Sequence, residues 1–148
     1  MIEPGGGAVG KPELEFHVPD GPWRTPAGAG PGVEERVLAD DPEHGSRTAL
    51  VRWAPGTDTS ADGVTRHDFW EEVYLVEGAL HDLTLDRTFT AGMYACRPPG
   101  MPHGPWTAPE GVTMLVVTYR PESGALGVPP AEGWGRDGAT GRDGAAAG

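Results

Sequence analysis

Residues 67–78 read HDFWEEVYLVEG and contain the strongest strand signal in the chain. A short apolar run, residues 73–76, follows the two glutamates, and Gly78 ends the stretch, which is typical of a β-strand that borders a protein core. Because successive side chains point to opposite faces of a strand, we expect His67, Phe69 and Glu71 to share one face. A histidine and a carboxylate on one face supply two of the ligands of a metal site.

The second informative stretch, residues 92–106, reads GMYACRPPGMPHGPW. A short strand ends here in a Pro-Pro-Gly turn, and His103 follows that turn. Proline fixes the backbone, so it lowers the conformational entropy that is lost when a nearby side chain is held in a ligand position. His103 is therefore the third candidate metal ligand.

Outward from these two stretches, short apolar runs between glycines and prolines predict further strands. The runs cover residues 33–39, 47–54, 79–85, 87–91, 93–96 and 112–119. We expect residues 79–85 to form a hairpin with the strand that ends at Gly78. No stretch shows a sustained helical stripe with caps. The pattern predicts an all-β protein, an antiparallel sandwich or barrel.

Glycine and proline divide the chain into three parts. Residues 1–32 hold eight glycines and six prolines, and residues 123–148 hold eight glycines and two prolines. We expect a partly ordered N-terminal arm over 1–32, a folded domain over 33–122 and a flexible tail over 123–148, because such composition disfavours a packed core. Within the arm, residues 12–23 are expected to add an edge strand, to the same barrel or to that of a partner.

The chain of 148 residues carries 11 basic and 22 acidic side chains, a formal net charge of −11. It has no basic stripe to neutralise phosphates, so we expect neither a nucleic-acid partner nor an anionic membrane partner. No apolar run approaches the roughly 20 residues of a membrane-spanning helix. The single cysteine, Cys96, excludes an internal disulfide, and the first residues lack the pattern of a signal peptide. These features predict a cytoplasmic protein.

The two stretches resemble the two sequence motifs of the cupin superfamily. The first motif matches at His67, Glu71 and Gly78, with Thr65 in place of the first histidine of the family's His-x-His pair. The second motif matches in register at Gly92, Pro98, Gly100 and His103, with Thr107 in place of the final asparagine. The segments EEVYLVEG and RPPGMPHGPW are most similar to the cupin domains of ChrR-type anti-sigma factors.

The resemblance implies a double-stranded β-helix of antiparallel sheets, a small jelly-roll barrel with a metal in its mouth. It also implies His67, Glu71 and His103 as the metal ligands. Two histidines and one carboxylate are typical of non-haem Fe(II) oxygenases, in which three protein ligands leave open positions for substrate and dioxygen. Fe(II) is therefore the favoured metal, and Zn, Ni or Mn are the alternatives.

Other side chains in and near the motifs are candidates for the same site. Tyr94 and His81 are candidate acid–base groups, with core packing as the alternative for Tyr94 and surface exposure for His81. The candidate walls of a substrate pocket are Thr65, Phe69, Cys96 and Trp106. For Cys96 the alternative is a buried thiol in the core. Glu72 competes with Glu71 as ligand, because a β-bulge exchanges the two faces of a strand.

The leading functional hypothesis is a metal-dependent cupin enzyme that acts on a small organic molecule, with a non-haem Fe(II) dioxygenase favoured. The second is a Zn-, Ni- or Mn-dependent isomerase, cyclase or lyase, in which the metal acts as a Lewis acid. The third is a non-catalytic sensor or binding domain of the ChrR type, and the fourth is a degenerate cupin without metal. Trp70, Tyr74 and Val76 are expected opposite Glu71, and an apolar outer face predicts a homodimer.

Overall fold

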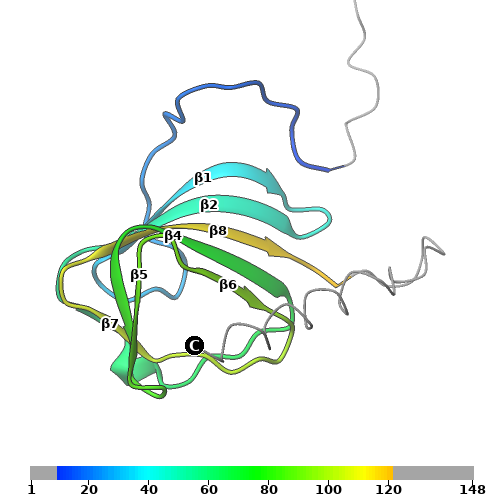
Figure 1. The fold of residues 1–148 in the computed structure, drawn as a ribbon. Helices are drawn as coiled ribbons and strands as arrows, with labels where there is room; N and C mark the ends of the chain where they lie inside the picture. Colours follow the sequence, from blue (N-terminus) through cyan, green and yellow to red (C-terminus); the bar gives the residue numbers. More distant parts are fainter. Residues whose placement is uncertain (1–9, 122–148) are drawn as a thin grey trace, which may run out of the picture.

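The computed structural model describes residues 10–121, and strands dominate them (Figure 1). The strands are β1 (Val33–Asp41), β2 (Ser46–Trp53), β3 (Thr57–Asp58), β4 (Trp70–Asp82), β5 (Arg87–Thr90), β6 (Tyr94–Arg97), β7 (Trp106–Ala108) and β8 (Val112–Tyr119). A short 3₁₀ helix, η1 (Ser60–Asp62), lies between β3 and β4. All strand pairs are antiparallel, in the order β1-β2-β8-β4-β7-β3, with β5 and β6 also paired to β4. The predicted all-β, antiparallel fold class is confirmed.

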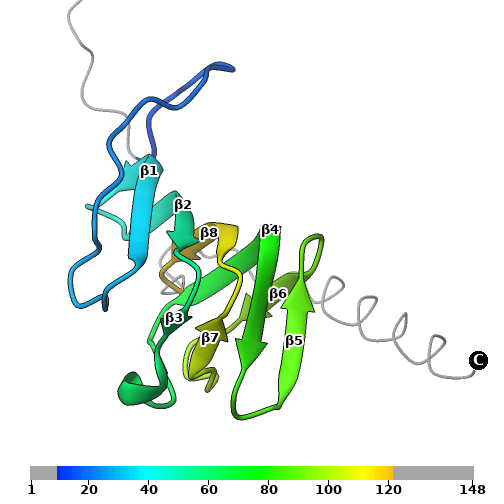
Figure 2. The same cartoon turned by 90° about the vertical axis from the view of Figure 1, so that its left-hand side faces the viewer.

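The central strand β4 belongs to both halves of the curled sheet (Figure 2). Its first part pairs with β8 and β6, and its second part pairs with β5 and β7. Gly78 lies where the partners change, with φ +83°, and a Cβ there would be 2.2 Å from the carbonyl oxygen of Gly111. This position needs glycine because β4 changes sheets there, in close contact with the backbone before β8.

The predicted hairpin at Gly78 is therefore wrong, because β4 continues through this glycine to Asp82. The hairpin turn lies after Asp82 instead. The carboxylate of Asp82 accepts backbone N–H bonds from Thr84 (2.8 Å) and Leu85 (2.9 Å). An aspartate that satisfies the backbone two and three residues later is a common way to close a turn.

The inward face of β4 changes from odd to even positions along the strand. Val73 and Leu75 are buried in its first part, whereas Leu80 and Asp82 are buried in its second. The pairing with β8 shifts register between Leu75 and Glu77, as at a β-bulge, and such an extra residue reverses the alternation that follows. Strict alternation from Glu71 thus assigns the wrong face to every residue beyond the shift.

The two halves of the sheet enclose one apolar core. Its buried members are Val73, Leu75, Leu80, Trp106, Ala108, Val112 and Met114. Val51, Trp53, Phe89 and Val116 pack against them. Trp106 and Ala108 come from β7, a short strand that the sequence did not predict because it follows a run of prolines and glycines.

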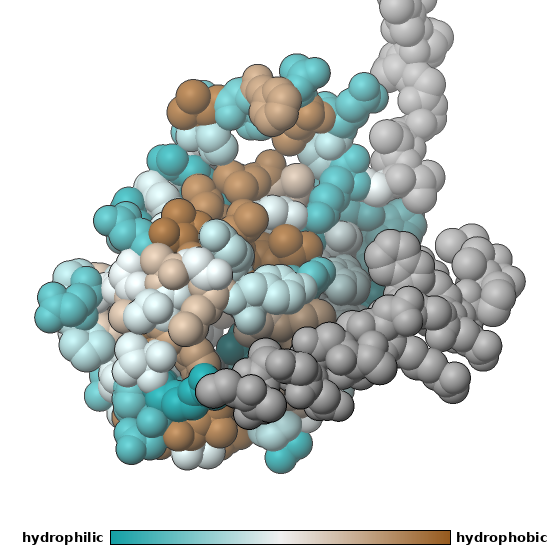
Figure 3. Space-filling view, in the orientation of Figure 1, coloured by the Kyte–Doolittle hydropathy of each residue, from teal (hydrophilic) through white to brown (hydrophobic). Residues whose placement is uncertain are grey.

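Residues 10–32 form an arm over β1 (Figure 1). Arg24 makes a β-bridge to Glu35, and the ring of Trp23 lies 4.8 Å from the guanidinium carbon of Arg36. Residues 12–23, the predicted edge strand, form no strand within this chain. Figure 3 shows apolar side chains on the body of the molecule just below the arm. The division at residues 33 and 122 stays a prediction, and the predicted tail lies outside the described residues.

Within residues 10–121, no helix has the length and apolar character needed to cross a bilayer.

Candidate metal centre and cavity

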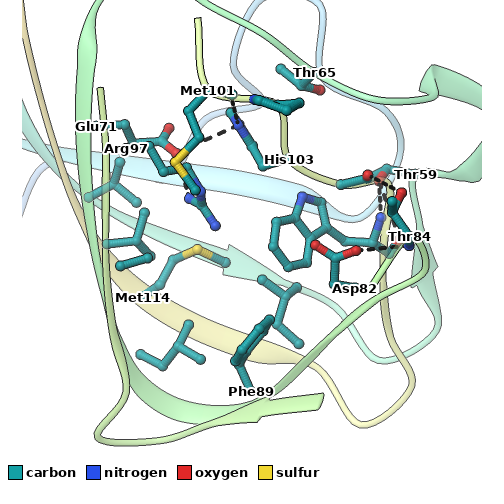
Figure 4. Close-up of a pocket in the computed structure, with 18 of the residues that line it drawn as sticks. Thr59, Thr65, Glu71, Asp82, Thr84, Phe89, Arg97, Met101, His103 and Met114 are labelled. Atoms are coloured by element: carbon teal, nitrogen blue, oxygen red, sulfur yellow. Dashed lines mark hydrogen bonds and ion pairs between the residues drawn. The ribbon is translucent and has the colours of Figure 1, made fainter. Parts of the chain in front are cut away.

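A cavity of about 730 Å³ lies between the two halves of the curled sheet (Figure 4). Apolar side chains from several strands form most of its wall; they include Val51, Trp53, Val73, Leu75, Leu80, Phe89, Trp106, Met114 and Val116. Glu71, Arg97 and His103 bring polar groups to one end, and Thr65 lies at the rim beside them. An apolar chamber with a few converging polar groups is the usual form of a small-molecule site.

His67, Glu71 and His103 converge at the polar end of the cavity. One ligand atom from each lies within 4.8 Å of the others. Nε2 of His67 is 3.8 Å from Oε2 of Glu71, and Nε2 of His103 is 3.9 Å from Oε1. The structure thus brings the three predicted ligands together, in a cluster that fits a divalent metal.

Both imidazoles are oriented by their Nδ1 atoms. Nδ1 of His67 donates to the carbonyl of Phe69 (3.0 Å), and Nδ1 of His103 donates to the carbonyl of Met101 (3.1 Å). Because a carbonyl only accepts, each Nδ1 carries a proton, and in the neutral ring Nε2 is left as the metal-binding atom. Burial lowers the pKa of His103, and the nearby Arg97 adds to this effect, so its neutral, ligating form is favoured.

Nε2 of His67 is buried and has no hydrogen-bond partner in the part of the chain that the structure describes. A buried polar atom without a partner costs about 1–3 kcal/mol. A metal ion between His67, Glu71 and His103 would satisfy this atom, so the donor set and its surroundings fit a divalent metal ion.

Two loops are held together so that the two histidines meet. Thr65 and His103 exchange backbone hydrogen bonds of 2.8 and 3.0 Å, and Gly100 donates its N–H to the carbonyl of His67 (2.8 Å). Thr65, which replaces the family's first histidine, therefore positions His103 through its backbone. Thr65 is also among the residues that line the cavity.

Arg97 is a site residue that the sequence reasoning missed. Glu71 and Arg97 are directly opposite each other in the pairing of β4 with β6, so both point inward. Nη1 of Arg97 donates to Oε1 of Glu71 at 2.8 Å, and the guanidinium carbon lies 5.2 Å from the centre of the Trp106 ring. Only the strand register identifies this pair, because no motif marks Arg97.

Three predicted residues point away from the large cavity. The ring of Phe69 stacks on His67 at 4.0 Å and borders a separate, smaller depression, so it supports the ligand from behind. Cys96 is exposed, because it is paired with the outward-facing Glu72. His81 faces outward because of the register shift in β4. Its Nε2 lies 3.3 Å from Oδ1 of Asp86, and its Nδ1 pairs with the hydroxyl of Thr88.

Tyr94 and Trp106 both contribute to the cavity wall. The hydroxyl of Tyr94, however, donates to Glu72 on the outer face, and this bond raises the pKa of Tyr94. The candidate acid–base hydroxyl is thus directed away from the metal cluster. The same bond shows which of the two neighbouring glutamates faces out, since Glu71 meets the histidines.

The outer face of β4 exposes about half of Tyr74 (46%) and of Val76 (50%). Trp70, on the same face, stacks on Tyr119 with a ring separation of 6.2 Å. These residues lie opposite the cavity, as the alternation predicts for this part of the strand. The homodimer inferred from that face stays a prediction.

Residues 13–122 match the family model described as the ChrR Cupin-like domain. No curated protein matches the sequence significantly. Among solved structures, an RmlC-like cupin from Shewanella frigidimarina has a TM-score of 0.59 and 19% identity, over 76% of this chain and 96% of that one.

Two further solved structures share the fold. An acetylacetone dioxygenase from Acinetobacter johnsonii has a TM-score of 0.57 and 20% identity, over 73% of this chain and 74% of that one. KdgF from Halomonas sp. has a TM-score of 0.52 and 19% identity, over 68% of this chain and 88% of that one. At these identities the similarity concerns the fold alone.

Proposed function

Because this chain belongs to the ChrR cupin-like family, we propose that it is a metal-dependent enzyme acting on a small organic molecule, with Fe(II) and dioxygen favoured. One observation carries the proposal. The buried Nε2 of His67 has no partner among the described residues, and it faces a carboxylate and a second imidazole whose Nε2 is also directed inward. Two histidines and one glutamate are the ligand set of non-haem Fe(II) oxygenases.

The residues of the site have distinct roles in this proposal. His67, Glu71 and His103 would hold the metal, which supplies open coordination positions and redox chemistry with dioxygen. Glu71 contributes the negative charge that compensates part of the ion's charge. The apolar wall around Leu75 and Met114 excludes water from a substrate in the cavity.

The fold neighbours support the proposal at the level of the fold. The acetylacetone dioxygenase shows that a cupin of similar shape accommodates a dioxygenase. It does not identify the substrate of this chain, since the same fold hosts many reactions.

Metal content tests the proposal directly. We expect wild-type protein, purified without a histidine tag or added metal, to contain about one metal ion per chain by plasma mass spectrometry. His103→Ala should lose that ion, whereas His81→Ala should keep it, because His81 lies on the outer face. Equal metal content in wild type and His103→Ala, also after anaerobic loading with Fe(II) and Zn(II), would contradict the proposed site, and no metal in either protein would contradict a metal enzyme.

The identity of the metal separates the two enzyme classes. Iron in the protein as purified, together with oxygen uptake on addition of substrates, supports the oxygenase. Zinc, nickel or manganese without oxygen uptake would favour the isomerase, cyclase or lyase, in which the ion acts as a Lewis acid.

A second candidate function, a sensor or binding domain, is favoured by the match to the ChrR Cupin-like domain. It predicts that metal or ligand raises the melting temperature without turnover and that a partner protein co-purifies with the chain. For either function we propose a cytoplasmic protein without nucleic-acid or membrane partners, in keeping with its net charge of −11.

A further inference from the structure

Arg97 brings hydrogen-bond donors into the cavity that the protein does not use. Its side chain is 10% exposed, and within residues 10–121 its one hydrogen bond runs from Nη1 to Glu71. Nε and Nη2 have no partner among these residues, and the guanidinium points toward the middle of the cavity, between Glu71 and Met114 (Figure 4). A guanidinium offers its remaining N–H groups as a planar fork, which matches the two oxygens of a carboxylate.

The charges that line the cavity favour a single anion. Its interior holds one guanidinium, Arg97, and two carboxylates, those of Glu71 and Asp82, while Asp62 and Arg66 at the rim offset each other. With neutral imidazoles, a bound divalent cation would leave one net positive charge. Because an uncompensated charge in an apolar chamber is costly, a ligand with one negative charge completes the site better than a neutral or doubly charged one.

We infer that the cavity binds a small organic acid whose single carboxylate pairs with the free fork of Arg97 and whose apolar body lies against the wall. This inference deepens the proposed function and rests on it for the metal beside Arg97. The wall beyond the guanidinium is apolar, with Val73, Leu80 and Met114 among its members. Arg97 is thus a specificity-determining binding residue, and it joins the ligand to Glu71, the glutamate of the metal cluster.

Benzoate and benzamide form a matched pair of probes, since they share size and shape and differ by one charge. Zinc binding to the wild type is measured first, because Zn(II) is redox-inert, and the two probes are then titrated calorimetrically with and without Zn(II). We expect benzoate to bind the zinc-loaded wild type about 10- to 100-fold more tightly than benzamide, the range typical of hydrogen bonds to a charged group. By linkage, zinc should increase the affinity for benzoate.

Arg97→Met should abolish the preference for benzoate while zinc binding is retained. Arg52→Met is the matched control, because Arg52 does not line the cavity; its side chain is 44% exposed and pairs with Glu34. This variant should keep the preference. If Arg97→Met does not fold, Arg97→Lys carries the test. It keeps the charge without the fork, and we expect about tenfold weaker benzoate binding.

The outcomes separate this inference from the proposed function. If wild type binds zinc but binds benzoate and benzamide equally, or if Arg97→Met keeps the preference, the carboxylate subsite is wrong and the metal site stands. If wild type binds no zinc, the proposed function fails. A benzoate preference of the metal-free protein that Arg97→Met abolishes would then still support the subsite, and its absence would overturn both.

Discussion

Glu71 and Glu72 are neighbours in the sequence, yet the two faces of β4 give them opposite surroundings. Glu71 faces the cavity, where it meets two imidazoles and the guanidinium of Arg97. Glu72 faces outward, where it accepts the hydroxyl of Tyr94. A glutamate is thus placed for metal binding on one face of β4, whereas on the other face a glutamate links β4 to β6. The comparison teaches that the face and the strand register, and not the residue type, assign the chemistry.

The largest expected difference between the two faces is in metal affinity. Glu71→Gln removes a negatively charged ligand, so it should weaken metal binding by at least about 100-fold, since changes in the outer shell of a metal site alone cost about 10- to 100-fold. Glu72→Gln should leave metal affinity unchanged. Competition with a chromophoric chelator measures both variants, and equal losses in the two would break the comparison.

The two faces stay distinct because β4 keeps its path through Gly78. Gly78→Ala would place a Cβ 2.2 Å from the carbonyl oxygen of Gly111, at a φ of +83°. We expect a loss of about 3 kcal/mol or more in the free energy of unfolding, from backbone strain and overpacking together. Urea unfolding measures it.

Gly92→Ala is the control for Gly78→Ala. Gly92 has φ +91°, but no atom lies within 4 Å of a Cβ at this position. Its substitution should cost about 1 kcal/mol, from backbone strain alone. Similar losses in the free energy of unfolding for the two variants would mean that the nearby carbonyl of Gly111 is not the reason why position 78 needs glycine.

The smallest expected effect is on the proton equilibrium of Tyr119. Burial, together with a hydrogen bond to Glu72, raises the pKa of Tyr119 to about 12. The raised pKa keeps the phenol protonated at a pH where a free tyrosine, with a pKa near 10, is ionised. Absorbance at 295 nm should show Glu72→Gln lowering this pKa and Glu71→Gln leaving it in place. Tyr119→Phe identifies which absorbance transition belongs to Tyr119. Equal pKa values in the two glutamate variants would show that Glu72 does not influence Tyr119.

Local patterns in the sequence pointed to the three residues that the structure brings together in the candidate metal cluster. The motif spacing identified His67 and Glu71 together, although only Glu71 lies on β4 and His67 precedes the strand in a loop, and the proline turn before His103 marked the loop that meets them. Such features depend on residues close together in the chain. They can therefore be recognised without knowing which strands pair.

The features that were missed depend on contacts between distant strands. Arg97 is identified only by its pairing with Glu71, and the outward direction of His81 follows from a register shift against β8. Gly78 was predicted as a hairpin turn because glycine ends many strands, but here the backbone of Gly111 requires it. No local sequence pattern reveals these features, because each depends on a contact with a second, distant segment of the chain.

The position of β4 also has a consequence for how the protein unfolds. This one strand pairs with β5, β6, β7 and β8, so both halves of the sheet share a single covalent segment. Neither half keeps its core when β4 detaches from the sheet. We therefore expect one cooperative unfolding transition. Hydrogen exchange should be slowest in β4 and β8 and fastest in residues 10–32, whose backbone pairs with β1 at one β-bridge and which are otherwise held to it by side-chain contacts of Arg36.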